Sequence, residues 1–508
     1  MEAEISRSIE GFDPNGLVLD PASDHPLHHQ LYDGVRMMIV SGSVRGGTRI
    51  PSSRVLSQSL GVSRFTVITA LDRLTAEGYI RAVRGSGMYV EDVPSRLANK
   101  SSTNTNQGPK VSKWFQKLMS QRGSTLTWRE SRKPSKGSQL LDMATPDHRL
   151  FPTRIWTSLT KEIFTDWDYR TLNYRELPVR SLLEEQIAQH LAVSRGIRCD
   201  PEEVVTTLGA HHAVTLLAEL LLDPGDTVAF EEPGMPAIRS IFESYSSKIE
   251  PMFVDESGPN PSSVSRQNVK LAFVTAAKQQ PMNVSMPLKR KLEMLNWASE
   301  SGALIIEDDY ASDFKYRASP VLPLKALDQT GQVVHVGSFT STLLLSLRAG
   351  YMILPKALAN KCRELIQIRY RALPQLTEQT IARLIEDGHY GRHLHRVRKI
   401  YAKRQERFLS ILKSDLSDVF ELPEFAPGIY NLCYYKDQFI DEDEVLLRCE
   451  QSGLGVQQLS YYFASGRSPR KALMVGFAAS NESEIELGLR LLKQCVLQSS
   501  AHRPKRSS

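Results

Sequence analysis

The sequence has few cysteines and no long hydrophobic run. Its five cysteines are odd in number and scattered along 508 residues, without the close pairs that metal sites use. No segment offers the roughly 18 consecutive apolar residues that a spanning helix needs, and the acidic start Met1–Glu4 is unlike a signal peptide. We therefore expect reduced thiols, no metal site, no membrane contact and a cytoplasmic location.

The formal net charge of +6 is also small for this length. It permits a polyanionic partner but is too weak to demonstrate one, so the placement of the charges matters more than their sum. Hydrophobic residues at 41% and charged residues at 24% are typical of folded proteins. Because one hydrophobic core stops growing at roughly 250–300 residues, we expect at least two domains.

A polar stretch divides the chain. Residues 93–138 are rich in Ser, Asn, Gln, Lys and Arg and have little apolar periodicity, which predicts a flexible linker. The linker separates a candidate domain at 24–92 from a larger one at 139–495. Residues 496–508 are predicted to form a basic, solvated tail.

Three helices are predicted before the linker. Apolar residues recur at helical spacing over 27–39, and Ser52 or Ser53 can begin a second helix that ends at Gly61. Ser63 can begin a third helix only two residues later. Such a short turn makes two helices cross steeply, which is the geometry of a helix-turn-helix.

A hairpin is predicted after the third helix. Residues 79–83 and 88–90 are strand-like and flank Arg84-Gly-Ser-Gly87, whose glycines fit a tight turn. A glycine-rich tip lets the backbone approach a groove of DNA, and the arginine can neutralise a phosphate. This hairpin is a candidate wing.

The stretch 26–90 resembles the GntR family of winged-helix regulators. The matching motifs are Pro51-Ser-Ser-Arg-Val-Leu56, Leu60-Gly-Val-Ser-Arg-Phe-Thr-Val67, Ala76-Glu-Gly-Tyr79 and Arg84-Gly-Ser-Gly87. The resemblance implies double-stranded DNA as a partner. The residues expected to touch DNA are Arg54, Ser63, Arg64, Phe65, Thr66, Arg84, Gly85, Ser86 and Gly87. Taken singly, each feature also fits a packing motif with solvated charges.

After residue 140, short apolar runs alternate with helical patterns. This alternation predicts a mostly parallel sheet covered by helices. The candidate strands are 204–207, 227–230, 271–275, 304–306, 333–336 and 351–354. Ligands of such sheets bind at the carboxyl ends of the strands.

Polar residues follow several of these strands. Gly209 precedes a helix whose first N–H groups can hold a phosphate, and Asp308 ends a buried strand where a carboxylate can pair with a protonated ring nitrogen. Arg348 and the hydroxyls of 337–343 can form a second wall for a phosphate.

From Phe151 to about Gln494 the chain resembles the fold-type-I, class I/II aminotransferases. The matching motifs are Ser194-Arg-Gly-Ile-Arg-Cys199, Leu222-Asp-Pro-Gly-Asp226, Glu307-Asp-Asp-Tyr310 and Arg396-Val-Arg-Lys-Ile-Tyr401. Together with the N-terminal resemblance, the chain looks like the MocR-type regulators. The expected fold class is α/β: a winged helix-turn-helix plus an aminotransferase-like domain with a large subdomain at about 175–380 and a smaller α+β subdomain at about 390–495.

The resemblance implies pyridoxal 5'-phosphate as a cofactor. Asp308 would bond its pyridine nitrogen and Tyr310 its phenolic oxygen. Tyr174 would reach in from the partner subunit of a head-to-tail homodimer. The residues that would hold the phosphate are Gly209, Ala210, Ser338 and Arg348.

The lysine that forms the imine in this family is missing. The family's Gly-Thr-Phe-Ser-Lys-Thr-Leu segment reads Gly337-Ser-Phe-Thr-Ser341-Thr-Leu343, and no lysine occurs between Lys325 and Lys356. The hydroxyl of Ser341 cannot form an imine or replace the amine as a proton shuttle. We expect no catalytic residue and pyridoxal phosphate held at most noncovalently.

Other positions depart from the family as well. Val179 and Glu184 stand where the family has a glycine and an arginine, and Met235 replaces a tyrosine. The segment Gln279–Asn283 replaces a Gln-x-Pro-Thr-Gly motif. The arginine that clamps the substrate carboxylate would fall near Met474, so the clamp is expected to be lost.

Three functions are consistent with these features. The first is a DNA-binding transcriptional regulator whose aminotransferase-like domain dimerises and senses a small-molecule effector. The alternative is an aminotransferase-like regulator or enzyme that retains its cofactor, and the third is a DNA-binding protein whose large domain is only a scaffold. Lys278 lies beside the pocket in sequence, and we expect a solvated surface lysine rather than a substitute anchor.

Overall fold

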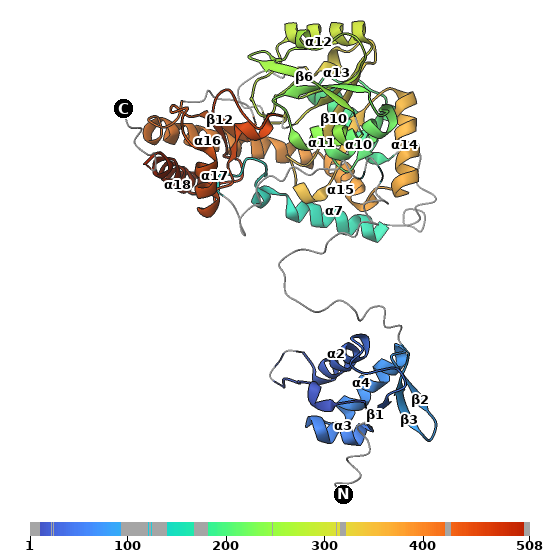
Figure 1. The fold of residues 1–508 in the computed structure, drawn as a ribbon. Coiled ribbons are helices and arrows are strands. Elements are labelled where there is room, and N and C mark those ends of the chain that lie inside the picture. Colours follow the sequence, from blue (N-terminus) through green and yellow to red (C-terminus); the bar gives the residue numbers. More distant parts are fainter. Residues whose placement is uncertain are drawn as a thin grey trace. The chain divides into compact units, whose positions relative to one another are not determined.

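The computed structural model divides the chain into two compact units, residues 1–112 and 113–508 (Figure 1). The structure describes residues 11–92 except 22 and 24, residues 120 and 123, and residues 140–166, 181–245, 247–310, 312–314, 322–421 and 428–501. Most of the predicted linker at 93–138 lies outside the described residues. Within them, no helix has the length and apolar character needed to cross a membrane.

The first unit is a winged helix-turn-helix, as predicted. Its elements are α2 (Leu27–Val40), β1 (Arg49–Ile50), α3 (Ser53–Leu60), α4 (Arg64–Ala76), β2 (Ile80–Val83) and β3 (Gly87–Val90). The Ser52 hydroxyl accepts from Val55 N at the start of α3, and the Ser63 hydroxyl accepts from Thr66 N at the start of α4. Gly61 ends α3 in the left-handed conformation. The strands pair in the order β1-β3-β2.

The core of this unit extends further toward the N-terminus than predicted. Leu56, Val67 and Leu74 are fully buried between the helices, as their helical spacing indicates. Phe12 and Leu17 are buried in the same core, on either side of a short 3-10 turn, η2 (Pro14–Gly16). Residues that precede the predicted domain start at residue 24 therefore contribute to the same core.

The second unit contains an eight-stranded sheet, and all six predicted strands are present in it. The strands are β4 (Val204–Thr207), β5 (Thr227–Glu232), β6 (Lys248–Asp255), β7 (Gly258–Pro259), β8 (Val269–Val274), β9 (Leu304–Asp308), β10 (Val333–Ser338) and β11 (Gly350–Ile353). Their order is β4-β11-β10-β9-β8-β5-β6-β7. Strands β10, β9, β8, β5 and β6 run parallel, whereas β11 is antiparallel to both of its neighbours.

Helices cover both faces of this sheet (Figure 1). They are α7 (Thr153–Asp166), α9 (Leu182–Ser194), α10 (Ala210–Leu221), α11 (Pro236–Ser244), α12 (Leu288–Ser301), α13 (Leu324–Leu327), α14 (Lys356–Tyr370), α15 (Gln375–Glu386) and α16 (His389–Asp415). Phe230 of β5 packs in the cluster that includes α10, α11 and α14, whereas its neighbour Ala229 packs in the cluster that includes α12. Because both faces are buried, the strands are continuously hydrophobic instead of alternating.

A smaller α+β part follows, as predicted. Strands β12 (Tyr430–Tyr434), β13 (Gln457–Gln458) and β14 (Ala472–Gly476) pack with the long helix α16, with α17 (Glu442–Gln451) and with α18 (Glu482–Ala501). Leu140 pairs with Leu454, so the start of the body belongs to this part. Helix α18 continues to Ala501 with Val496 buried, past the predicted start of the tail at residue 496.

Candidate functional site

The N-terminal turn of α4 presents an exposed mixed surface. Phe65 is 78% exposed and Ile68 is 39% exposed, although the opposite side of the helix is buried. Arg64 is exposed, and its Nε donates to Ser53 Oγ at 3.2 Å. Thr66 is half-buried, and its hydroxyl lies 2.8 Å from that of Ser63. The capping bonds fix this turn, which leaves Arg64 and Phe65 facing solvent.

The wing tip is exposed. Gly85 has φ +77° and Gly87 has φ +118°, and Arg84 and Ser86 are exposed between and beside them. The Ser86 and Tyr89 hydroxyls lie 2.6 Å apart. These glycines adopt backbone conformations that side chains with a Cβ rarely tolerate.

Arg49 lies beside the wing tip and was not predicted. A Cβ added to Gly87 would lie 3.1 Å from Arg49 Nε, and Arg49 pairs with Tyr89 across β1 and β3. The strand that carries Arg49 has only two residues, which is too short to produce a periodic signal in the sequence.

The charges of the winged helix balance. Residues 11–92 contain eight arginines, no lysine and eight acidic residues. Arg73 is paired with Glu77 at 3.0 Å, and Arg36 donates to Tyr79. Any attraction to a polyanion therefore depends on where the remaining arginines lie, including Arg54 on exposed α3 surface, and not on an overall excess of positive charge.

In the second unit, three strand ends bring predicted site residues to one edge of the sheet. Strand β4 leads into Gly209, the N-cap of α10, and β9 ends at Asp308. Strand β10 ends at Ser338. Since β4 is antiparallel to β11 and β11 is antiparallel to β10, the carboxyl ends of β4, β9 and β10 lie on the same side.

Four polar groups converge in front of α10. A Cβ added to Gly209 would lie 4.0 Å from the Arg348 guanidinium and 4.0 Å from Thr340 Oγ1. The Ser338 hydroxyl donates to Thr340 Oγ1 at 2.7 Å, and Thr340 N donates to Ser338 Oγ at 3.0 Å. With Ala210 as the first residue of α10, this arrangement offers N–H, hydroxyl and guanidinium donors to an anion.

Arg348 has an unusual backbone conformation for this position. Its φ is +48°, in the left-handed region that non-glycine residues seldom occupy. Strain of this kind persists where the surroundings fix it, and it concentrates at functional sites. Nearby, His212 is buried, and burial together with Arg348 lowers its pKa to about 4, so the imidazole is neutral.

Asp308 and Tyr310 lie at the end of β9. Burial, assisted by Asp309, raises the pKa of Asp308 to about 7, and burial raises the pKa of the Tyr310 phenol. A pyridinium nitrogen would supply the positive charge that favours an ionised Asp308. These residues therefore fit the group that the sequence resemblance implies.

The expectation that Lys278 is a solvated lysine is wrong. Its side chain is 2% exposed, and its Nζ has no hydrogen-bond partner among the described residues. Nζ lies 3.8 Å from the ring centroid of Tyr430 and 6.0 Å from that of Tyr310. The loop after β8 therefore turns this lysine inward, next to a predicted cofactor residue.

Ser341 and Met474 are both buried. Ser341 is 8% exposed in the turn after β10, and Met474 is fully buried in β14, opposite Leu432 and Gln457. Neither side chain supplies an amine or a guanidinium. Tyr174 and Val179 lie outside the described residues.

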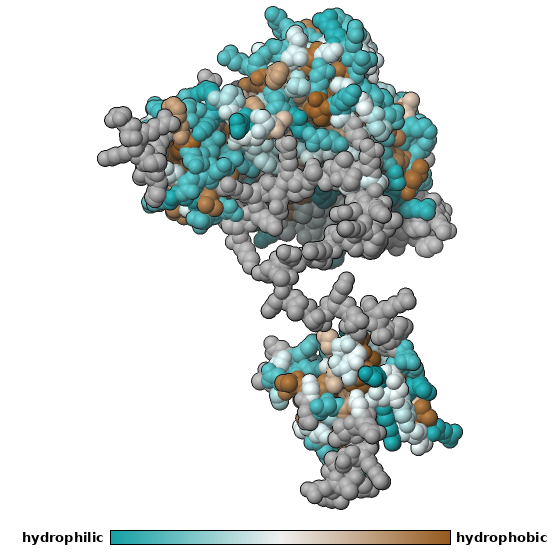
Figure 2. Space-filling view, in the orientation of Figure 1, coloured by the Kyte–Doolittle hydropathy of each residue, from teal (hydrophilic) through white to brown (hydrophobic). Residues whose placement is uncertain are grey.

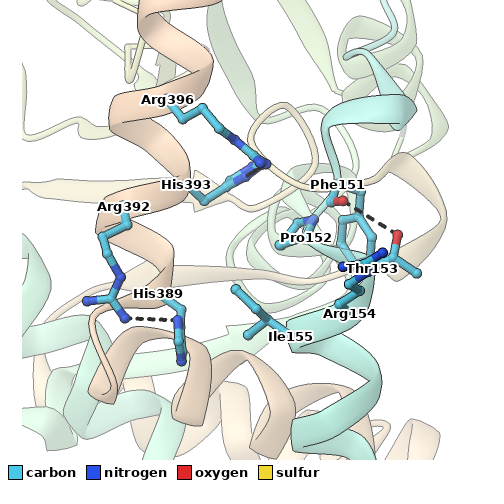
Figure 3. A pocket seen from close by; sticks show the side chains of 9 residues that line it. All are labelled: Phe151, Pro152, Thr153, Arg154, Ile155, His389, Arg392, His393 and Arg396. Atoms are coloured by element: carbon cyan, nitrogen blue, oxygen red, sulfur yellow. Dashed lines mark hydrogen bonds between the residues drawn. The ribbon is translucent and has the colours of Figure 1, made fainter.

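A cavity of about 520 Å³ lies between the start of α7 and α16 (Figure 3). Its lining residues are Phe151, Pro152, Thr153, Arg154, Ile155, His389, Arg392, His393 and Arg396. None of the predicted cofactor residues lines it. His393 Nε2 lies 2.7 Å from the carbonyl oxygen of Thr342, so this cavity adjoins the segment of Ser341 from the α16 side.

Comparison with known proteins identifies both units. Residues 27–90 match the model of the bacterial regulatory proteins of the gntR family, and residues 161–430 match that of aminotransferase class I and II. The probable rhizopine catabolism regulatory protein MocR of Rhizobium meliloti is 31% identical, covering 95% of this chain and 96% of that protein.

The chain belongs to the MocR-type regulators.

The chain is also similar to a second regulator and to a solved aminotransferase structure. The HTH-type transcriptional regulator TauR of Rhodobacter capsulatus is 28% identical over 93% of this chain and 96% of its own length. The crystal structure of Pyrococcus horikoshii kynurenine aminotransferase covers 77% of this chain and 99% of that chain, with a TM-score of 0.67 at 21% identity. The structural likeness shows that the body of this MocR-type regulator has the aminotransferase fold.

Two of the departures from the family have clear structural roles in this MocR-type regulator. Glu184 closes a capping box with Ser181 at the start of α9, and its carboxylate lies 3.5 Å from Arg363. Asn283 stands at the position of a family glycine and keeps a left-handed φ of +62°. Asparagine is one of the few residues that tolerate this conformation.

The sequence did not reveal three residues near the predicted sites. Thr340 belongs to the hydroxyl-rich segment 337–343, but the sequence gives no sign that its hydroxyl lies close to Gly209. Arg49 and Lys278 gave no usable signal, because a lone cation is more often solvated than buried or placed at a site. Only the three-dimensional packing distinguishes them.

Proposed function

We propose that this MocR-type regulator reads DNA with α4 and the wing, and that its aminotransferase-like body has lost transamination and serves dimerisation and ligand sensing in the cytoplasm. The observation that carries the first part is the exposure of Arg64 and Phe65 on a capped helix end. An exposed aromatic and a guanidinium at this position match the groups that contact thymine methyls and guanine edges.

Arg54, Ser63, Thr66 and the wing residues 84–87 are proposed to support this contact. Hydroxyls and exposed arginines bond phosphates and set the register, whereas base-edge contacts carry specificity. Ser63 also caps α4, so its hydroxyl has a structural role in addition. A dimer would present two such heads to repeated half-sites.

The loss of transamination rests on Ser341. A hydroxyl forms no imine with a carbonyl carbon, and it cannot move the proton that an amine would move. Met474 removes the guanidinium that the family uses to clamp a substrate carboxylate. Among the described residues of the predicted site, Lys278 is the one buried amine near Tyr310.

The retained residues would still hold pyridoxal phosphate. Gly209, Ala210, Ser338 and Arg348 would take the phosphate, and Asp308 would take the ring nitrogen. When bound, the group would supply an aldehyde carbon and an electron-withdrawing ring. Tyr310 would donate its proton toward the phenolic oxygen, because its raised pKa keeps it protonated at neutral pH.

The DNA-reading role is tested with Arg64→Ala. Duplexes selected from a random pool by the purified full-length protein would provide the operator, and affinity would be measured by fluorescence anisotropy at fixed salt. We expect a loss of about 1–3 kcal/mol if Arg64 reads a base. Lys289→Ala, which removes an exposed cation from the body, is the matched control. Equal affinity of the Arg64 variant and the control would refute this role of Arg64.

A scaffold without any ligand is the competing function. It predicts that neither amino acids nor B6 vitamers raise the melting temperature, whereas a true ligand stabilises by mass action. Thermal shift and DNA binding measured in the same titration would separate the two.

A further inference from the structure

A buried lysine without a hydrogen-bond partner lies next to the predicted cofactor residues. Lys278 is 2% exposed, and no described residue accepts a hydrogen bond from its Nζ. The other fully buried lysine, Lys291, has its Nζ 2.6 Å from the carbonyl oxygen of Leu322. Burying an amine without a partner costs free energy that packing alone does not recover.

Lys278 Nζ packs closely against Gly428, which has no side chain. A Cβ added to Gly428 would lie 1.9 Å from Lys278 Nζ, so any other residue at 428 would displace the amine. The rings of Tyr430 and Tyr310 lie 3.8 and 6.0 Å from Nζ, measured to their centroids. The amine therefore contacts the ring of Tyr430 and lies near that of Tyr310, the predicted partner of the cofactor's phenolic oxygen.

This environment suits a nucleophilic amine. Burial is the cause that lowers the pKa of Lys278 to about 7, so a substantial fraction of the amine is neutral at physiological pH. A neutral, desolvated lysine attacks carbonyl carbons readily. The raised pKa of Tyr310 keeps a phenolic proton nearby that a departing oxygen can receive.

We propose that Lys278 is the reactive amine of a carbonyl-binding site in the body and condenses with an aldehyde ligand to form a reversible imine. Nζ forms a bond to the carbonyl carbon, the carbonyl oxygen takes up two protons, and it leaves as water. Nζ loses both of its protons over the sequence, so atoms and charge balance and no oxidant or reductant is required. The Tyr310 hydroxyl relays one of these protons.

The inference deepens the ligand-sensing part of the proposed function and revises the expectation, drawn from Ser341 alone, that any aldehyde is held noncovalently. It does not depend on DNA binding. The proposed ligand is an aldehyde, because an amine can bind an aldehyde covalently. The proposed site differs from the lysine site of the aminotransferases, because its amine comes from the loop after β8 and not from the turn after β10.

The test is chemical trapping in the full-length protein. Pyridoxal phosphate is added at stoichiometric concentration, the imine is reduced with borohydride, and the modified peptide is identified by mass spectrometry. We expect one pyridoxyl group on the peptide that contains Lys278 and at least tenfold less label in Lys278→Met. Exposed Lys289 and buried Lys291 serve as internal controls for background labelling.

Ser341→Ala is the matched variant at the ancestral position, and we expect it to be labelled like the unaltered protein. Lys278→Met removes a buried unpartnered amine and should fold with an unchanged or higher melting temperature. If Lys278→Met does not fold, the labelled peptide of the unaltered protein still shows whether Lys278 forms the adduct. Lys278→Gln provides a second neutral variant.

Two results would overturn the proposal. One is an adduct elsewhere or none at all. The other is ligand stabilisation without a reducible adduct, which would make Lys278 a cationic partner for a ligand carboxylate. Binding of Lys278→Met to selected DNA in the absence of ligand is expected to be unchanged, so failure of the trapping experiment would leave the regulator function standing.

Discussion

Burial raises the pKa of several carboxyl groups in the body to about 7. Burial raises the pKa of Glu378 to about 7, with the nearby Glu184 adding to the shift and a hydrogen bond with Thr206 opposing it. In this cluster Arg363 donates a hydrogen bond to Glu184, whereas Glu378 accepts one from Gln375. Glu378 is therefore protonated in the folded protein over a range where the unfolded chain is ionised.

We predict that stability falls as pH rises from about 4.5 to about 7, because the folded state then binds more protons than the unfolded state. The contribution of Glu378 is on the order of 3 kcal/mol. In urea titrations, the free energy of unfolding of Glu378→Gln should fall less between pH 5 and pH 8 than that of the unaltered protein. Glu256→Gln, an exposed position, is the control for the same change of charge. Parallel pH profiles for the unaltered protein and Glu378→Gln would contradict this assignment.

A lysine at position 341, where the sequence resemblance implies the imine-forming lysine, gives a second test at the residue scale. Ser341→Lys in a Lys278→Met background should yield an absorbance band near the visible edge when pyridoxal phosphate is added, because an amine again occupies position 341. Amino donors should not be turned over, since Met474 supplies no carboxylate clamp. Turnover by this variant would show that the clamp is not required.

At the scale of elements, the wing offers a prediction with an internal control. Gly87 has φ +118° and lies against Arg49, whereas Gly85 has φ +77° and open space around its Cα. Gly87→Ala should cost about 1–3 kcal/mol of stability in the winged helix and weaken DNA binding. Gly85→Ala should cost about 1 kcal/mol. Chemical denaturation of both variants checks the order, and equal losses would contradict it.

The sequence predicted those elements whose pattern is local. The six strands that are buried on both faces appeared as apolar runs, and the serine caps marked α3 and α4 correctly. The segment around Phe12 was missed because two apolar residues flanking a short 3-10 turn have no period. Strand β6 was missed too, since Glu250 and the exposed Pro251 interrupt its apolar residues.

The candidate sites divide in the same way. Gly209, Asp308, Ser338 and Arg348 could be placed because each follows a recognisable strand or motif. The inward turn of Lys278 could not be predicted, since it depends on Gly428 and Tyr430, which are 150 residues away in sequence. Contacts of that range leave no trace in one sequence.

At the scale of the whole molecule, the two compact units should unfold separately. Each has its own hydrophobic core. Calorimetry of the full chain should therefore show two transitions, and pyridoxal phosphate should raise only the one that belongs to the body. The isolated segment 11–92 would identify the other transition. A single transition that shifts as a whole would show that the units are energetically coupled.

The visible surface of each unit is mixed in hydropathy. On the face shown in Figure 2, brown residues are scattered among teal and white ones on both units, where the atoms are coloured. Scattered apolar residues of this kind are normal for protein surfaces.

The equal numbers of arginine and acidic side chains in the winged helix have a consequence for its search of the chromosome. Most of a genome is competitor sequence, and proteins are retained on it mainly by releasing counterions from phosphates. Because this head has no surplus charge, the counterions that it releases depend on how many of its exposed arginines contact phosphates. In the proposed dimer, occupancy of an operator would depend on matched bases and on two heads binding together, so a ligand that changed the pairing of the subunits would change DNA binding.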